Sequence, residues 1–135
     1  MKNLIAMLML LCMCLGLCAC ASMDKIEENL KGSYKIESMD TDELEEMVEE
    51  WDMDMDADDF DVKDAIYATH KKKGIGVMVV ECGSKAKAED LAKECEDVVD
   101  LLEKYYGSKY SFDSVAEGRF VLIGEEDAIA DALDK

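Results

Sequence analysis

Aspartates alternate with other residues between positions 52 and 61, where the chain reads Asp-Met-Asp-Met-Asp-Ala-Asp-Asp-Phe-Asp. Carboxylates at alternate positions of a loop can surround a calcium ion, which prefers oxygen ligands. The chemistry that this spacing indicates is low-affinity binding of a divalent cation. The candidate metal ligands are Asp52, Asp54, Asp56 and Asp58.

The acidic loop departs from the EF-hand calcium loop after its first three acidic positions. Ala57 stands where an EF-hand has Gly, and Lys63 stands where its bidentate Glu closes the ligand shell. Lysine supplies no oxygen, so the ligand with the most contacts is missing. We therefore interpret the segment as a solvated acidic loop, with Met53, Met55 or Phe60 able to pack on the core, and keep calcium binding as the alternative.

Catalytic residue types are scarce in the chain. His70 is the only histidine, which excludes a multi-histidine metal site and leaves one candidate general base. It lies next to Lys71–Lys73 in an expected hairpin turn, where we predict an exposed surface residue. Cys82 stands at a strand-to-helix junction but has no neighbouring histidine to activate it, and no Gly-x-Ser-x-Gly elbow occurs. We expect a non-enzymatic protein with no catalytic residue and no cofactor.

The chain opens with Lys2 and then runs from Leu4 to Cys20 without a charged residue. This run of about 17 residues is at the lower limit for crossing a bilayer as a helix. A short positive segment followed by an apolar core is typical of a signal peptide. The first residues therefore predict export.

The end of this run, Leu17-Cys18-Ala19-Cys20, resembles the lipobox of bacterial lipoprotein precursors. An aliphatic residue stands three positions before the cysteine, and a small residue directly precedes it. The resemblance implies cleavage before Cys20 and a diacylglyceryl thioether on its sulfur. Acylation of the new amino terminus would give more than one acyl chain, which is enough for stable anchoring.

This interpretation divides the chain into a signal peptide (1–19), a lipidated N-terminus with a short tether (20–23) and one acidic domain (24–135). Two alternatives are an uncleaved single-span anchor and an ordinary secretory signal cut near Ala19 or Ala21. All three place the domain on the extracytoplasmic side of the cell membrane. They differ only in how the domain is attached.

Acidic residues outnumber basic ones by 33 to 15, and the formal net charge is −18. Nucleic-acid binding needs lysines and arginines that neutralise phosphate, so this composition argues against it. It also argues against adsorption to anionic lipid headgroups. We expect the lipid to supply the membrane contact and an envelope protein to be the partner.

Hydrophobic spacing predicts the elements of the domain. Asp24 is the expected cap of a short helix that ends near Gly32, and a strand covers 34–37. Asp40 and Glu43 form a capping-box-like start to a helix. Its apolar face consists of Leu44, Met47, Val48 and Trp51.

The rest of the domain reads as two hairpins and two helices. Strands 64–70 and 74–82 form the first hairpin, and a long helix covers 84–106. Strands 110–116 and 119–123 form the second, turning at Glu117-Gly118. A last helix follows Gly124 and carries Ala128, Ile129, Ala132 and Leu133 on one face.

These elements predict an α+β fold, a two-layer sandwich of antiparallel hairpins packed against helices with the other sheet face partly wet. The arrangement is either ferredoxin-like or a duplicated helix–hairpin unit.

Cys82 and Cys95 should be buried free thiols, because the second lies about ten residues into the helix, roughly 15 Å along its axis. In layout the domain is similar to small lipoproteins of Gram-positive bacteria, which end in an apolar strand, a Gly-acidic turn and a short helix, here Val121–Ile129. That resemblance implies no activity.

Overall fold

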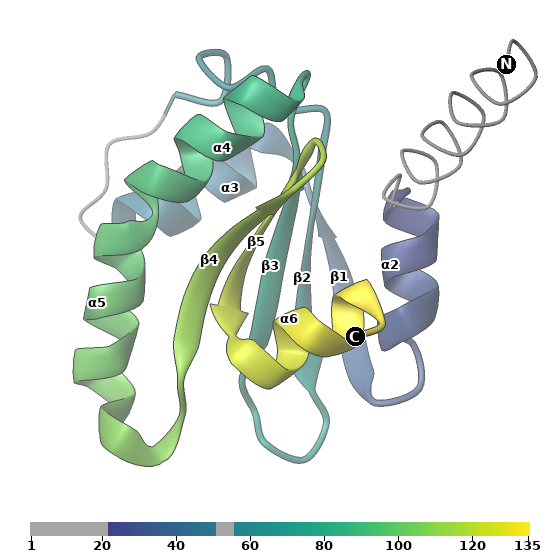
Figure 1. Ribbon diagram of the computed structural model, residues 1–135, viewed down its shortest axis with the longest axis vertical. Helices are drawn as coiled ribbons and strands as arrows, with labels where there is room; N and C mark the ends of the chain where they lie inside the picture. Colours follow the sequence, from purple (N-terminus) through teal and green to yellow (C-terminus); the bar gives the residue numbers. More distant parts are fainter. Residues whose placement is uncertain (1–21, 51–55) are drawn as a thin grey trace, which may run out of the picture.

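The computed structural model describes residues 22–50 and 56–135, in which a five-stranded sheet carries helices on both faces (Figure 1). Its elements are α2 (Met23–Leu30), β1 (Tyr34–Met39), α3 (Thr41–Glu50), β2 (Asp64–His70), β3 (Gly76–Glu81), α4 (Lys85–Glu94), α5 (Glu96–Tyr106), the 3₁₀ turn η1 (Gly107–Lys109), β4 (Phe112–Glu117), β5 (Phe120–Glu125) and α6 (Glu126–Leu133). The predicted α+β class, with antiparallel hairpins packed against helices, is confirmed.

The strands lie in the order β1-β2-β3-β5-β4, and every neighbouring pair is antiparallel. The hairpins β2–β3 and β4–β5 meet at the β3–β5 pair, and each hairpin follows helical structure, α3 in one case and α4 with α5 in the other. This order fits the duplicated helix–hairpin unit. A ferredoxin-like split βαβ unit makes the strands on either side of a helix parallel, with another strand between them. The strands β3 and β4, which flank α4 and α5 and enclose β5, have this arrangement. By contrast, β1 and β2, which flank α3, are antiparallel neighbours.

Each face of the sheet has its own hydrophobic core. One core lies under α3, α4 and α5 and includes Leu44, Met78, Leu91, Val98 and Val121. The other lies under α2 and α6 and includes Ile26, Leu30, Val77, Leu122 and Ile129. The sheet face that we expected to be partly wet is therefore covered by two short helices, and β3 and β5, buried on both faces, read as unbroken apolar runs.

The long helix predicted over 84–106 is two helices that meet at Cys95. That residue has φ −79° and ψ −3°, away from ideal helical values, and its N–H still donates to the carbonyl of Leu91. Ser84 begins α4 by accepting a hydrogen bond from the N–H of Lys87. The bend lets α4 pack on β4 and β5 while α5 continues along β4.

Several predicted boundaries also shift. The side chain of Ser22, not Asp24, caps α2 by accepting from the N–H of Lys25 at 3.1 Å. The second hairpin turns at Gly118-Arg119, because Gly118 adopts φ +58°, and β5 continues through Gly124 to Glu125. The predicted start of α3 is confirmed, since the N–H of Glu43 donates to the Asp40 carboxylate at 2.8 Å.

Candidate functional site

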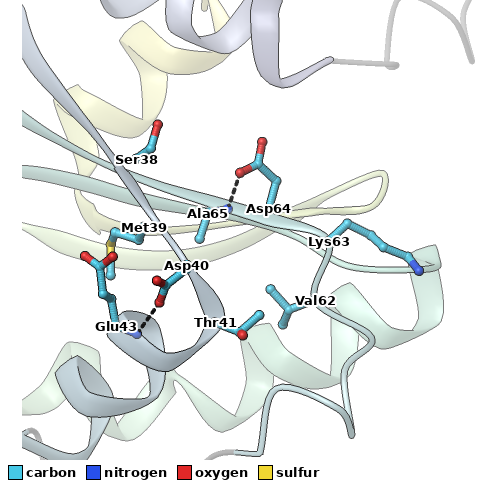
Figure 2. A pocket seen from close by; sticks show the side chains of 9 residues that line it. All are labelled: Ser38, Met39, Asp40, Thr41, Glu43, Val62, Lys63, Asp64 and Ala65. Atoms are coloured by element: carbon cyan, nitrogen blue, oxygen red, sulfur yellow. Dashed lines mark hydrogen bonds between the residues drawn. The ribbon is translucent and has the colours of Figure 1, made fainter.

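A hollow of about 530 Å³ lies where β1 ends, α3 begins and the chain returns to β2 (Figure 2). Its lining residues are Ser38, Met39, Asp40, Thr41, Glu43, Val62, Lys63, Asp64 and Ala65. Asp40 caps α3, and Asp64 accepts a hydrogen bond from the N–H of Ala65 at 2.9 Å. The single cation of the lining, Lys63, is paired with Asp61 at 3.0 Å, so the hollow is acidic.

A second hollow of about 280 Å³ continues the first along β1 and α3. The two share Ser38, Met39 and Glu43, and the second adds Glu37, Glu46, Met47, Glu50 and Tyr67. Glu43, Glu46 and Glu50 lie on one side of α3, and Glu37 lies on β1. The half-buried Met47 and Tyr67 border the core. Burial, with a smaller effect of the neighbouring Tyr106, raises the pKa of Tyr67. The two hollows form one groove, which we call the β1 groove.

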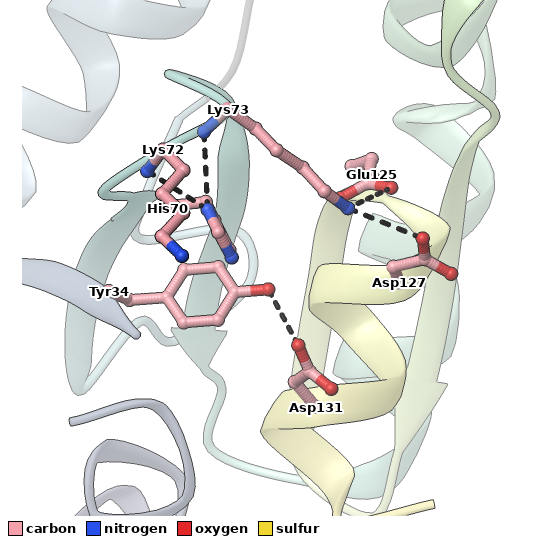
Figure 3. A network of polar contacts seen from close by, with 7 residues as sticks. All are labelled: Tyr34, His70, Lys72, Lys73, Glu125, Asp127 and Asp131. Carbon is pink, nitrogen blue, oxygen red and sulfur yellow. Dashed lines mark hydrogen bonds and ion pairs between the residues drawn. The ribbon is translucent and has the colours of Figure 1, made fainter. Parts of the chain in front are cut away.

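A polar network fastens α6 to the turn between β2 and β3 (Figure 3). The ammonium of Lys73 lies 3.4 Å from Oε1 of Glu125 and 3.3 Å from Oδ2 of Asp127. The hydroxyl of Tyr34 donates to Asp131 at 2.8 Å. Glu125 is 4% exposed and is the buried charged residue of the described chain, so Lys73 supplies its counter-charge.

Two groups of this network have shifted pKa values. Burial, and then the hydrogen bond to the Asp131 carboxylate, raises the pKa of Tyr34, so its hydroxyl stays a neutral donor. Burial opposes the charge of Lys73, but Glu125 and Asp127 outweigh that effect and raise its pKa. Near neutral pH, Tyr34 therefore stays neutral and Lys73 stays positively charged, as the network needs. Both groups stabilise the fold in these states, and neither exchanges a proton near neutral pH.

His70 is not the exposed turn residue that the sequence predicts. Its side chain is half-buried at the end of β2, and its ring meets that of Tyr34 edge to face, with 5.0 Å between centroids. Its Nδ1 accepts from the backbone N–H groups of Lys72 and Lys73, at 3.1 and 3.2 Å. The imidazole therefore stabilises the turn that places the ammonium of Lys73 near α6. The sequence did not indicate this role, because the neighbouring lysines suggested an exposed turn.

Cys82 and Cys95 are free and buried, at 0% and 1% exposure, as expected. Burial, with a smaller effect of nearby carboxylates, raises the pKa of Cys82 to about 11 and that of Cys95 to about 12. Thiolates are the reactive form, so neither side chain is a nucleophile near neutral pH.

The raised thiol pKa values give a pH dependence. Their ordinary value is 9.0, and a raised folded-state pKa means that folding favours the protonated thiol. Its contribution to stability is complete below about pH 9 and is lost as the pH rises towards 11 to 12. We expect slow alkylation of both thiols in the folded protein at about pH 8 and fast alkylation in urea, measured by peptide mass mapping. Equal rates in both states would contradict their burial.

The acidic loop is described only in part, because Asp52 and Asp54 lie outside the described residues, as does Trp51 of the predicted helix. The Asp56 carboxylate accepts from the N–H of Asp58 at 2.9 Å, and Glu45 accepts from the N–H of Ala57 at 3.0 Å. Phe60 packs on the core, as expected. Residues 22–50 and 56–135 contain no group of three or more His, Cys, Asp or Glu side chains arranged to hold a metal ion. Calcium binding stays a prediction.

The predicted lipobox, Leu17, Cys18, Ala19 and Cys20, also lies outside the described residues. The first described helix begins at Met23, three positions after Cys20. Across the described ranges, no helix is long and apolar enough to cross a membrane.

The β1 groove and the Lys73–Glu125 pair were not predicted from the sequence. Glu43, Glu46 and Glu50 recur at helical spacing on α3, which is the one local signal for the acidic wall of the groove. The Lys73–Glu125 pair joins residues far apart in the chain and left no such signal. No family model matches the chain, and neither does any curated protein or solved structure.

Proposed function

We propose that this protein is a bacterial lipoprotein, anchored through Cys20 to the extracytoplasmic face of the cell membrane. Its folded domain serves there as a non-enzymatic binding module for an envelope protein. The observation that carries the proposal is the segment Leu17-Cys18-Ala19-Cys20 at the end of an uncharged run that follows Lys2.

The start of the folded domain supports the anchor. Ser22 caps α2, which begins at Met23, so very few residues separate the proposed lipid from the domain. Such a chain cannot act as a long flexible stalk. The domain would therefore lie close to the bilayer, where the net charge of −18 limits contact with anionic headgroups.

The side chains of the described domain support a binding role over catalysis. His70 uses its Nδ1 to hold a backbone turn. Burial keeps the thiols of Cys82 and Cys95 protonated. The β1 groove is open, and its carboxylates border an edge strand rather than an enclosed cavity. Such a surface suits contact with another macromolecule.

Replacement of Cys20 tests the anchor. In a bacterial host, the wild-type chain should be found in the membrane fraction, with a mass that corresponds to a chain starting at Cys20 plus a diacylglyceryl group. Cys20→Ala should keep the uncleaved signal peptide and lack the lipid, because the sulfur is the site of the thioether. Intact mass and membrane fractionation make the comparison.

Cys18→Ala is the matched control, since it removes a neighbouring thiol and leaves Cys20 in place. It should be processed and lipidated like the wild type. An unmodified wild-type chain, or a lipidated Cys20→Ala chain, would refute the proposed anchor.

A further inference from the structure

We propose that β1 is the docking edge of this protein and that its occupant is an extended segment of a partner protein with lysine or arginine at alternate positions. The segment would pair with β1 as a sixth strand, so that its basic side chains enter the β1 groove. The inference rests on the proposed role as a binding module and names the chemistry of the partner.

The hydrogen-bond pattern shows which backbone groups of β1 are available. The N–H of Lys71 donates to Ser33 on the β1 side of β2. Bonding direction alternates along antiparallel strands, so odd-numbered residues of β1 face β2 and even-numbered residues face outward. The outward groups belong to Tyr34, Ile36 and Ser38. Within residues 22–50 and 56–135, their N–H and C=O groups on this side have no backbone partner.

The opposite edge of the sheet, β4, is less open. The helices α4 and α5 both pack against it, and Figure 1 shows them running beside it. The hydroxyl of Ser114 on β4 also donates to the carbonyl of Ala92 on α4, at 2.8 Å. Figure 1 shows α2 beside β1, but α2 packs on that strand less extensively than α4 and α5 pack on β4. The less shielded edge strand is the better template for pairing with another chain, so β1 is the better candidate for docking.

The charges of the β1 groove select a basic occupant. Its lining contains Glu37, Asp40, Glu43, Glu46, Glu50 and Asp64 against one lysine. That lysine, Lys63, is already paired with Asp61, and Glu37 is paired with Lys35 of β1 at 3.2 Å. The other five carboxylates form no ion pair with a described residue. A second copy of this chain, with a net charge of −18, would be repelled by these carboxylates.

The spacing of the α3 carboxylates also fits an added strand. Side chains on one face of a strand recur about every 7 Å. Glu43, Glu46 and Glu50 recur at about 4.5 to 6 Å along α3, within the reach of long basic side chains. Met47 and Tyr67 offer apolar surface to the aliphatic stems of lysine or arginine. Backbone pairing would thus supply affinity, and the carboxylates would supply specificity.

A labelled octapeptide in which Lys alternates with Thr tests the proposal. Fluorescence anisotropy would measure its binding to the full-length protein in zwitterionic detergent, at an ionic strength of about 0.02 M, where screening is weak. We expect saturable binding that weakens with added salt. The same peptide with Glu in place of Lys should not bind, and binding of both peptides with equal affinity would refute the charge selection.

Two substitutions separate the backbone from the charges. Ser38→Pro removes an outward N–H from an edge strand, where proline is tolerated, and should weaken binding at least about tenfold, whereas Ser38→Ala should not. Glu46→Gln with Glu50→Gln should weaken binding about three- to tenfold and flatten its salt dependence. Glu94→Gln with Glu103→Gln, on α4 and α5, is the matched control for the charges.

A peptide N-methylated on its Thr residues keeps the edge test independent of protein folding. In an antiparallel sixth strand whose Lys side chains enter the groove, the N–H groups of the Thr residues face β1. The methylated peptide cannot donate these hydrogen bonds and should bind the wild-type protein at least about tenfold more weakly. Equal binding of the methylated peptide, unchanged binding to Ser38→Pro, or no binding of the lysine peptide at about 1 mM would each overturn the proposal. Cys20→Ala should bind the peptide normally, so failure of the anchor and failure of the edge are distinguishable.

Discussion

Replacing Gly76 by Ala is expected to destabilise the protein by about 3 kcal/mol or more, a cost at the upper end of overpacking substitutions. Gly76 begins β3, and a Cβ atom built there would collide with the backbone carbonyl of Ala68 in β2. A carbonyl in a ladder cannot move aside as a flexible side chain can. Either the β2–β3 ladder breaks locally or the two strands separate.

A second glycine makes relaxation on the other side harder. Gly124 on β5 has φ +153°, and a Cβ atom there would meet the carbonyl of Gly76 and the Cα atom of Val77. The strand β3 is therefore confined by backbone on both sides. Gly32→Ala is the control, because nothing lies within 4 Å of its added Cβ, and its effect should stay within about 0.5 kcal/mol. Urea unfolding gives both free energies, and equal values for the two variants would contradict this account.

Lys73→Met is expected to cost about 2 kcal/mol, because it leaves the Glu125 carboxylate buried without a counter-charge. The side chain of Glu125 is 5% exposed, and that of Lys73 is 34% exposed. Partial exposure of the lysine places the cost below that of a fully buried pair. Glu125→Gln should cost less, since the lysine keeps Asp127 and reaches water.

The double variant separates pairing from packing. If the loss of stability in Lys73→Met comes from the buried Glu125 carboxylate without a counter-charge, adding Glu125→Gln should restore much of the free energy of unfolding in a double-mutant cycle. Lys72→Met is the control, because that lysine lies in the same exposed turn and forms no ion pair with a described residue. Additive costs for Lys73 and Glu125, measured by urea unfolding, would show that the pair is not coupled.

Local patterns predicted the elements well. The apolar run Val77–Val80 became a strand buried on both faces, and Asp40 with Glu43 marked the start of α3. The helical face around Ala128 and Ile129 is buried as expected. These signals arise from neighbours in the chain, so they can be read before the fold is known.

Arrangements that depend on distant residues could not be predicted in the same way. The pairing of β3 with β5 and the cover that α2 and α6 give to the second sheet face depend on which apolar surfaces meet. The β1 groove exists because α3 docks beside an edge strand, and the role of His70 depends on a turn that brings two N–H groups to its ring. In each case the sequence shows the type of residue but not the residue or backbone group that it contacts in the fold.

The β3–β5 pair has a consequence for how the chain folds. Each hairpin joins residues close in sequence, whereas this seam pairs Val77 with Gly124 and Glu81 with Phe120. Bringing β3 and β5 together closes the long segment between them, which costs chain entropy before the contacts between the two strands can form. The hairpins β2–β3 and β4–β5 can therefore form separately, and the pairing of β3 with β5 should be the step that limits the rate of folding.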